Sequence, residues 1–141
     1  MKRTATASWK GGLKDGSGTI STTSGIFSNV PYTVPGRFET GAGTSPEELI
    51  AAAHASCFAM ALSAELGKVG LTPESIDSKS TVSLDKLDSG WTVTASRLEV
   101  TAKIPGADRA KFQQAADTAK AGCPISRLLK ADITLEAKLI S

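Results

Sequence analysis

The stretch of sequence that decides the fold is SPEELIAAAHASCFAMALSAELG, which occupies residues 45–67. Ser45 can cap a helix, Pro46 suits a first helical turn, and Glu48 lies where it would complete a capping box with Ser45. Helix-favouring residues follow, and Gly67 can end the run. The sequence therefore predicts one long central helix over residues 45–67.

This helix carries apolar residues around most of its circumference. They are Leu49, Ile50, Ala53, Cys57, Phe58, Met60, Ala61 and Leu62. We expect the helix to be buried on nearly all sides. In a chain of 141 residues, a partner subunit is one explanation for so much apolar surface. The apolar run is interrupted by His54, Ser56 and Cys57 and is too short to span a bilayer.

Short strands are expected before the helix. Ala5, Ala7 and Trp9 alternate with polar residues, glycines then mark a turn, and residues 18–23 can return as a second strand. A third extended piece over residues 32–40 is flanked and interrupted by prolines, so we expect an edge strand or irregular structure there.

The second half of the chain alternates strands and helices. A strand ending near Leu84 leads into a three-residue hairpin loop at 88–90, and the next strand changes its apolar alternation at Ser96-Arg97, which predicts a β-bulge. A helix over residues 108–122, a short helix from Pro124 and a last strand over residues 133–139 complete the pattern. The order βββ–α–ββ–αα–β predicts an α+β fold with a mainly antiparallel sheet.

We expect a single domain over residues 1–141, made of N-terminal strands in residues 1–42, the helix at 45–67 and a second half in residues 75–141. The net charge is only +2, and no basic block interrupts the mixture of charges, so we expect no nucleic-acid partner. Met1 and the two basic residues after it have no apolar run behind them, so no signal or transit peptide is expected. A cytoplasmic protein without a membrane partner follows from this interpretation.

The two cysteines lie in different settings. A free thiol has a pKa near ~8.5, so only about 3% is thiolate at pH 7. Cys123 precedes Pro124 and is expected to cap the short helix, which favours its thiolate. Cys57 lies inside the long helix, where desolvation raises its pKa, so it needs a cation from elsewhere in the fold.

Several uses of the two thiols are open on the residues alone: inert core filling, a static disulfide, part of a metal site, or a redox couple. A cytoplasmic setting favours redox or metal chemistry, and a metal site lacks its usual ligand spacings. His54 lies one turn before Cys57 and is either a base or a hydrogen-bonded buried group. Arg127, one turn after Cys123, adds positive potential or is a solvated helix residue.

Three segments resemble a known family. Residues 44–58, from Thr44 to Phe58 and including Cys57, are similar to the signature of the osmotically inducible protein C / organic hydroperoxide resistance (OsmC/Ohr) family. The segment Cys123-Pro124-Ile125-Ser126 resembles its second cysteine motif, and Gly36-Arg37-Phe38-Glu39 resembles its arginine segment. The resemblance spans nearly the whole chain and is nearer to the OsmC side of the family.

The resemblance implies an OsmC-like fold, an intertwined homodimer with active sites at the subunit interface, and a peroxidase that needs no cofactor and no metal. It implies that Cys57 attacks the peroxide and becomes a sulfenic acid, and that Cys123 resolves it as a disulfide. It further implies that Arg37 stabilises the thiolate and that Glu47 orients Arg37. The resemblance also implies that organic hydroperoxides are the preferred substrates and that a dithiol reductant, lipoyl-type or other, regenerates the enzyme.

Helix geometry limits how these residues meet. Ten helical residues separate Glu47 from Cys57 by ~15 Å, so either an arginine bridges them or Glu47 and Arg37 come from a second chain. We expect an apolar mouth formed by Phe38, Phe58 and Met60. The alternative functions are a thiol redox sensor or stress-binding protein without turnover, and a dimeric scaffold with inert thiols.

Overall fold

The computed structural model describes residues 1–39 and 41–141. It divides into two compact units, Met1–Leu49 and Ile50–Ser141. Each unit is described by itself below. The single domain over residues 1–141 therefore stays a prediction, and Thr40, at the end of the predicted third strand, lies outside the described residues.

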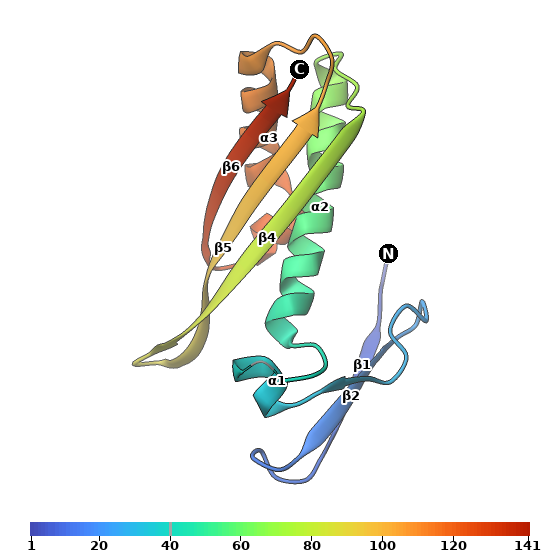
Figure 1. Ribbon diagram of the computed structural model, residues 1–141, viewed down its shortest axis with the longest axis vertical. Coiled ribbons are helices and arrows are strands. Elements are labelled where there is room, and N and C mark those ends of the chain that lie inside the picture. Colours follow the sequence, from blue (N-terminus) through green and yellow to red (C-terminus); the bar gives the residue numbers. More distant parts are fainter. Residues whose placement is uncertain (40) are drawn as a thin grey trace. The chain divides into compact units, whose positions relative to one another are not determined.

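The first unit is built on a three-stranded antiparallel sheet (Figure 1). Its strands β1 (Ala5–Lys10), β2 (Ser17–Thr22) and β3 (Val30–Tyr32) lie in chain order. Trp9 and Tyr32 pack together on this sheet, with ring centroids 5.4 Å apart. Gly18 lies beneath Tyr32, and a Cβ at Gly18 would come within 2.4 Å of that ring. Glycine at this position therefore lets the aromatic pair lie flat on β2.

The predicted extended segment over residues 32–40 is wrong over residues 34–38, because a short helix, α1 (Val34–Phe38), follows β3. Thr33 is extended and accepts a hydrogen bond from the N–H of Gly36 at 3.0 Å, which caps this helix. Pro35 lies in the first turn, where its missing N–H costs nothing. The proline that suggested an edge strand thus marks the start of a helix.

The central helix α2 (Pro46–Lys68) confirms the predicted start. The hydroxyl of Ser45 accepts a hydrogen bond from the N–H of Glu48 at 3.1 Å, as an N-cap does. The carboxylate of Glu48 accepts a hydrogen bond from the hydroxyl of Thr44 at 2.6 Å, one residue before the position that a capping box uses. Both contacts satisfy groups at the start of the helix, where backbone N–H groups lack partners.

Within the single chain, α2 is buried along one stripe, which corrects the expectation of burial on nearly all sides. The buried residues are His54, Phe58, Leu62 and Leu66, which recur every four positions. Met60, on another side, is 70% exposed. The reason is that this chain supplies one sheet and one further helix against a single face of α2, so apolar residues on its other faces stay uncovered.

By length and composition alone, α2 is also long and apolar enough to cross a membrane, with a mean hydropathy of 1.5. The core helix of a folded domain meets the same criterion. His54 lies in the middle of α2, fully buried and hydrogen-bonded to two serines of other elements. This arrangement is that of a core helix.

The second unit is a three-stranded sheet of β4 (Ser75–Leu87), β5 (Gly90–Lys103) and β6 (Asp132–Ile140). Strands β4 and β5 are antiparallel, and β6 runs parallel to β5 after a crossover through α3 (Arg109–Gly122) and α4 (Pro124–Leu128). Helices α2 and α3 cover the same face of this sheet (Figure 1). The predicted α+β class with mainly antiparallel sheets is confirmed.

Two details of the β4–β5 hairpin correct the predictions. The loop has two residues, because Gly90 already pairs with Leu87 and belongs to the strand. The bulge lies at Thr94, the extra residue opposite the step from Ser83 to Leu84, and not at Ser96-Arg97. Ser96 instead faces the core and is fully buried. Its polarity concealed that it belongs to the inward-facing positions of β5.

The hydrophobic core of the second unit lies between the sheet and helices α2 and α3. Its buried members are Phe58, Leu62, Leu66, Leu98, Val100, Ala102, Ile104, Phe112, Ala115, Ala116 and Ala119. The opposite face of the sheet carries exposed ion pairs such as Arg97–Glu136 at 2.8 Å. This mixed sheet therefore has one face on the core and one face toward water, as antiparallel sheets commonly do.

Truncating a leucine of the α2 stripe should destabilise the fold. Leu62→Ala removes a fully buried side chain, so the free energy of unfolding should fall by about 2–5 kcal/mol. Leu128→Ala is the matched control, because Leu128 is 75% exposed and should cost about 0.5 kcal/mol or less. Urea unfolding followed by circular dichroism measures both, and equal losses would contradict this core.

Candidate functional site

The two cysteines meet in the second unit. Cys57, inside α2, and Cys123, directly before α4, are 66 residues apart in sequence, and their Sγ atoms lie 2.9 Å apart as a thiol–thiol hydrogen bond. Both are free thiols. The turn between α3 and α4 brings Cys123 there, since its N–H donates to the carbonyl of Ala119 and ends α3. The pair is placed to form a disulfide once one sulfur is oxidised.

The two sulfurs differ in access to solvent. Cys123 is fully buried, whereas Cys57 is partly exposed. A reagent that arrives from solvent therefore contacts Cys57 first. Arg127, which the sequence placed near Cys123, is exposed on α4.

The pKa values of the two thiols move in opposite directions. Burial, together with the hydrogen bond to Cys123, raises the pKa of Cys57. Burial alone would raise the pKa of Cys123 too, but hydrogen bonding with Cys57 and with polar groups of Ser126 and Ile125 lowers it on balance. In the structure the Cys123 thiol donates to the sulfur of Cys57 across 2.9 Å.

Arg37 and Glu47 form an ion pair within the first unit. Arg37 lies in the last turn of α1, and Glu47 lies in the first turn of α2. Nη2 of Arg37 lies 2.6 Å from Oε1 of Glu47, and Nε lies 3.2 Å from both carboxylate oxygens. The hydrogen bond and the charge of Glu47 raise the pKa of Arg37, and burial opposes this. The carboxylate thus fixes a permanent cation in one orientation.

An apolar cavity of about 270 Å³ adjoins Arg37 in the same unit. It is lined by Trp9, Leu13, Tyr32, Thr33, Val34, Arg37 and Pro46. The indole N–H donates to the carbonyl of Gly11 and the phenol to the carbonyl of Ser8, each at 3.1 Å, so the polar atoms of both rings already have partners. The expected mouth of Phe38, Phe58 and Met60 is not found here, since Phe58 lies in the core. Alternation along β1 was the signal that Trp9 faces a cavity.

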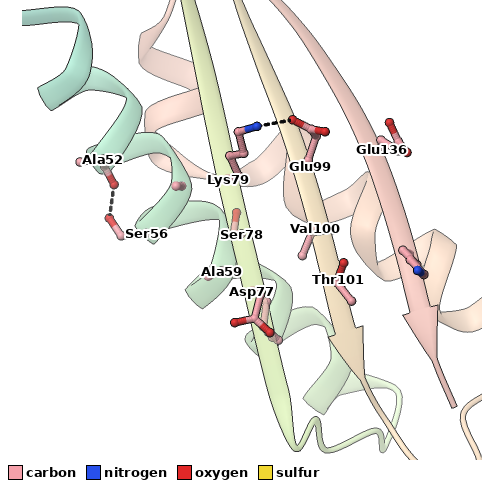
Figure 2. Close-up of a pocket in the computed structure, with 13 residues that line it drawn as sticks. Ala52, Ser56, Ala59, Asp77, Ser78, Lys79, Glu99, Val100, Thr101 and Glu136 are labelled. Atoms are coloured by element: carbon pink, nitrogen blue, oxygen red, sulfur yellow. Dashed lines mark hydrogen bonds and ion pairs between the residues drawn. The ribbon is translucent and has the colours of Figure 1, made fainter.

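A larger cavity, of about 710 Å³, lies in the second unit, and neither cysteine lines it. Figure 2 shows its wall of small α2 side chains, Ala52, Ser56 and Ala59, facing strands β4 and β5. Lys79 pairs with Glu99 across its rim at 3.5 Å. Glu136, also in its lining, pairs with Arg97 at 2.8 Å. The thiol pair, and not the larger volume, therefore locates the chemistry.

His54 is a hydrogen-bonded buried group, as one of the two interpretations of the sequence held. Its Nδ1 lies 2.6 Å from Oγ of Ser96, and its Nε2 lies 2.8 Å from Oγ of Ser126. Burial lowers the pKa of His54, so the ring is neutral at pH 7. Sequence reasoning missed both serines. The sequence did carry an indication of Ser126, because this residue follows Cys123 by about one helical turn.

Among residues 1–39 and 41–141, no group of three or more His, Cys, Asp and Glu side chains is arranged to hold a metal ion. Of the four site residues that the resemblance named, the structure pairs Cys57 with Cys123 and Arg37 with Glu47. One pair belongs to each unit.

Comparison with known proteins gives consistent matches. The family model described as OsmC-like protein matches residues 39–138. Peroxiredoxin OsmC of Escherichia coli K12 is 51% identical over 135 residues, which cover 96% of this chain and 94% of that protein. The organic hydroperoxide resistance protein of Xanthomonas axonopodis pv. citri is 31% identical over 100 residues, which cover 70% of this chain and 68% of that protein.

A solved structure agrees with this. The organic hydroperoxide resistance protein OhrB of Bacillus subtilis matches with a TM-score of 0.69 and 25% identity, over 97% of this chain and 98% of that one. The paired thiols, the fold and these matches lead to one conclusion: the chain belongs to the OsmC/Ohr family of OsmC-like proteins.

Proposed function

We propose that this chain is a cytoplasmic, cysteine-based peroxidase that reduces organic hydroperoxides, and inorganic ones less well. The observation that carries the proposal is the 2.9 Å contact between the sulfurs of Cys57 and Cys123. The names of the E. coli and Xanthomonas relatives, a peroxiredoxin and an organic hydroperoxide resistance protein, support the reaction class.

The proposed cycle has three steps. The thiolate of Cys57 attacks the peroxide, the O–O bond breaks, and an alcohol leaves while Cys57 becomes a sulfenic acid. Cys123 then attacks the sulfenic sulfur, an S–S bond forms, and the oxygen leaves as water. A dithiol reductant, lipoyl-type or other, reopens the disulfide by thiol–disulfide exchange and is itself oxidised.

Access supports Cys57 as the peroxide-reacting thiol, because Cys123 is fully buried. The pKa of Cys57 opposes this assignment when the second unit is considered by itself, because burial and the bond to Cys123 raise it. The proposal therefore requires a cation at Cys57, and Arg37 is its source. Glu47 holds the guanidinium by two of its nitrogens, which leaves the remaining donors for a thiolate or a peroxide oxygen.

The apolar cavity beside Arg37 supports an organic substrate. Its volume of about 270 Å³ lies near the lower end of the range of about 300–1,000 Å³ for small-molecule pockets, which suits a small alkyl or aryl group. Its lining combines a cation, Arg37, with two aromatic rings, Trp9 and Tyr32, and such a lining can receive both the polar and the apolar part of an organic hydroperoxide.

We further propose a homodimer in which Arg37 and Glu47 serve Cys57 of the other chain. Ten residues of α2 between Glu47 and Cys57 rise about 15 Å, which is far for an arginine held by Glu47 on the same helix. Uncovered apolar residues on α2, Met60 among them, support a second subunit. No nucleic-acid or membrane partner is part of the proposal.

Turnover distinguishes this function from redox sensing. With an alkyl hydroperoxide and a small dithiol in excess, the enzyme should consume many equivalents of peroxide per chain. A sensor would consume one equivalent and stop, and that result would overturn the proposal.

Replacing each cysteine separately should give different defects. Cys57→Ser should abolish peroxide consumption, because the attacking thiol is lost. Cys123→Ser, without added reductant, should consume one equivalent and stop with Cys57 as a sulfenic acid. Mass spectrometry after sulfenic-acid trapping measures both variants. A trapped sulfenic acid on Cys123 of the unaltered protein would reverse the two roles.

Removing the guanidinium should make Cys57 less acidic. In a Cys123→Ser background, Arg37→Ala should raise the pKa of Cys57 by about one unit or more, since a neighbouring cation lowers a thiol pKa. Arg97→Ala is the matched control, because Arg97 also pairs with a glutamate but lies on the exposed sheet face. Ultraviolet titration of the thiolate measures the pKa, and an unchanged curve for Arg37→Ala would remove Arg37 from the site.

Mixing two inactive chains tests the shared site. If Arg37 acts across the dimer, Arg37→Ala chains co-expressed with Cys57→Ser chains form mixed dimers with one intact site. Random pairing in a twofold dimer should then restore about a quarter of the activity. Each variant expressed alone is the control. No restored activity in a mixture whose mixed dimers are verified by mass would place Arg37 and Cys57 in the same chain's site.

A further inference from the structure

His54 is a buried titratable group that the proposed cycle does not use. It is fully buried, as is Ser96, and Ser126 is 8% exposed. A third serine extends the contact, because Oγ of Ser80 lies 3.0 Å from Oγ of Ser96. Four side chains from α2, β4, β5 and α4 are thus joined by hydrogen bonds in one unit.

This network of hydrogen bonds lies close to both cysteines in the sequence. His54 precedes Cys57 by three residues on α2, and Ser126 follows Cys123 by three residues at α4. The bond between His54 and Ser126 therefore joins the same two helices as the contact between the sulfurs, one turn away on each. Nδ1 of His54 is anchored to β5 through Ser96.

We propose that His54 is a positioning residue that acts through Ser126 on Cys123. It holds the Ser126 hydroxyl beside the Cys123 sulfur and keeps that sulfur facing Cys57, so that the sulfenic acid is resolved before a second peroxide arrives. This inference rests on the proposed function of the two cysteines.

One assignment of the protons gives each hydrogen bond of this network a donor and an acceptor. A neutral ring with the proton on Nε2 donates to Ser126, and the Ser126 hydroxyl is then free to donate to the sulfur of Cys123. Nδ1 accepts from the Ser96 hydroxyl, whose oxygen accepts from Ser80. In this arrangement each of the four side chains in the hydrogen-bonded network has a partner, as polar groups in a buried network require. The hydroxyl of Ser126 lowers the pKa of Cys123, in keeping with a donor aimed at its thiolate.

The step that this assists balances without another reactant. The Cys123 sulfur gives up its proton and attacks the sulfur of the Cys57 sulfenic acid. The S–S bond forms, the S–O bond breaks, and the departing oxygen takes that proton and leaves as water. A donor from Ser126 stabilises the attacking thiolate, and the brace between α2 and α4 keeps the two sulfurs in contact.

The test separates oxidation of Cys57 from resolution by Cys123. The unaltered protein and its variants are mixed with one equivalent of an alkyl hydroperoxide without reductant. The consumption of peroxide and the appearance of the disulfide are then followed separately by rapid quenching and mass spectrometry. Ser126→Ala and His54→Leu remove the bond, whereas Ser126→Thr and His54→Gln keep a hydroxyl or a donor. Ser56→Ala is the matched control, because the Ser56 hydroxyl bonds only its own helix at Ala52 and Ala53.

We expect peroxide consumption to stay within about twofold in Ser126→Ala, while disulfide formation slows about ten- to a hundredfold, the loss of one hydrogen bond to a charged group. In parallel samples that receive a second equivalent of the hydroperoxide, sulfinic acid on Cys57 should accumulate. Ser126→Thr and His54→Gln should recover most of the rate, which a role in folding alone would not explain.

Equal rates of disulfide formation in Ser126→Ala, Ser126→Thr and the unaltered protein would overturn the inference and leave the proposed function standing. Absence of any Cys57 oxidation in the unaltered protein would instead overturn the proposed function. If His54→Leu does not fold, the two Ser126 variants decide the matter alone.

Discussion

The contact between the sulfurs of Cys57 and Cys123 depends on how helix α2 is fixed on its sheet. A stripe of Phe58, Leu62 and Leu66 buries against β5 and α3 and sets the rotation of the helix. A single step along α2 would turn every side chain by about 100°, and Cys57 would then leave Cys123. The contact between the two thiols is therefore a consequence of core packing, and a hydrogen bond between His54 and Ser126 joins α2 to α4 nearby.

In this site the thiol that solvent can reach is not the more acidic of the two. Cys123 is the more acidic thiol of the second unit, yet it is fully buried, while Cys57 can be reached but has a raised pKa. In the proposed cycle, burial would protect the resolving thiol from peroxide, while a cation would activate the accessible thiol. The ion pair of Arg37 with Glu47 supplies a fixed cation in the other unit, and the proposed dimer joins the two halves of the chemistry.

The sequence predicted most elements because their signals are local, as with the cap at Ser45 and the helix after Asp108. It failed where long-range contacts overrule a local pattern. Ser96 is buried because a histidine on another element bonds it. At Pro35 the signal was local but was not recognised, since Thr33 caps the helix from three residues before Gly36. The cysteine pair and the ion pair were expected from family resemblance alone. No local pattern could show that Ser96 and Ser126 meet His54, since they lie 42 and 72 residues away.

The most direct measurement is the intact mass of the protein after one equivalent of an organic hydroperoxide, followed by peptide mapping and then by one equivalent of a small dithiol. The account predicts a loss of two hydrogens, a single link between Cys57 and Cys123 within one chain, and full return of both thiols with the dithiol. A stable gain of oxygen on either cysteine, or a link between cysteines of two chains, would contradict it.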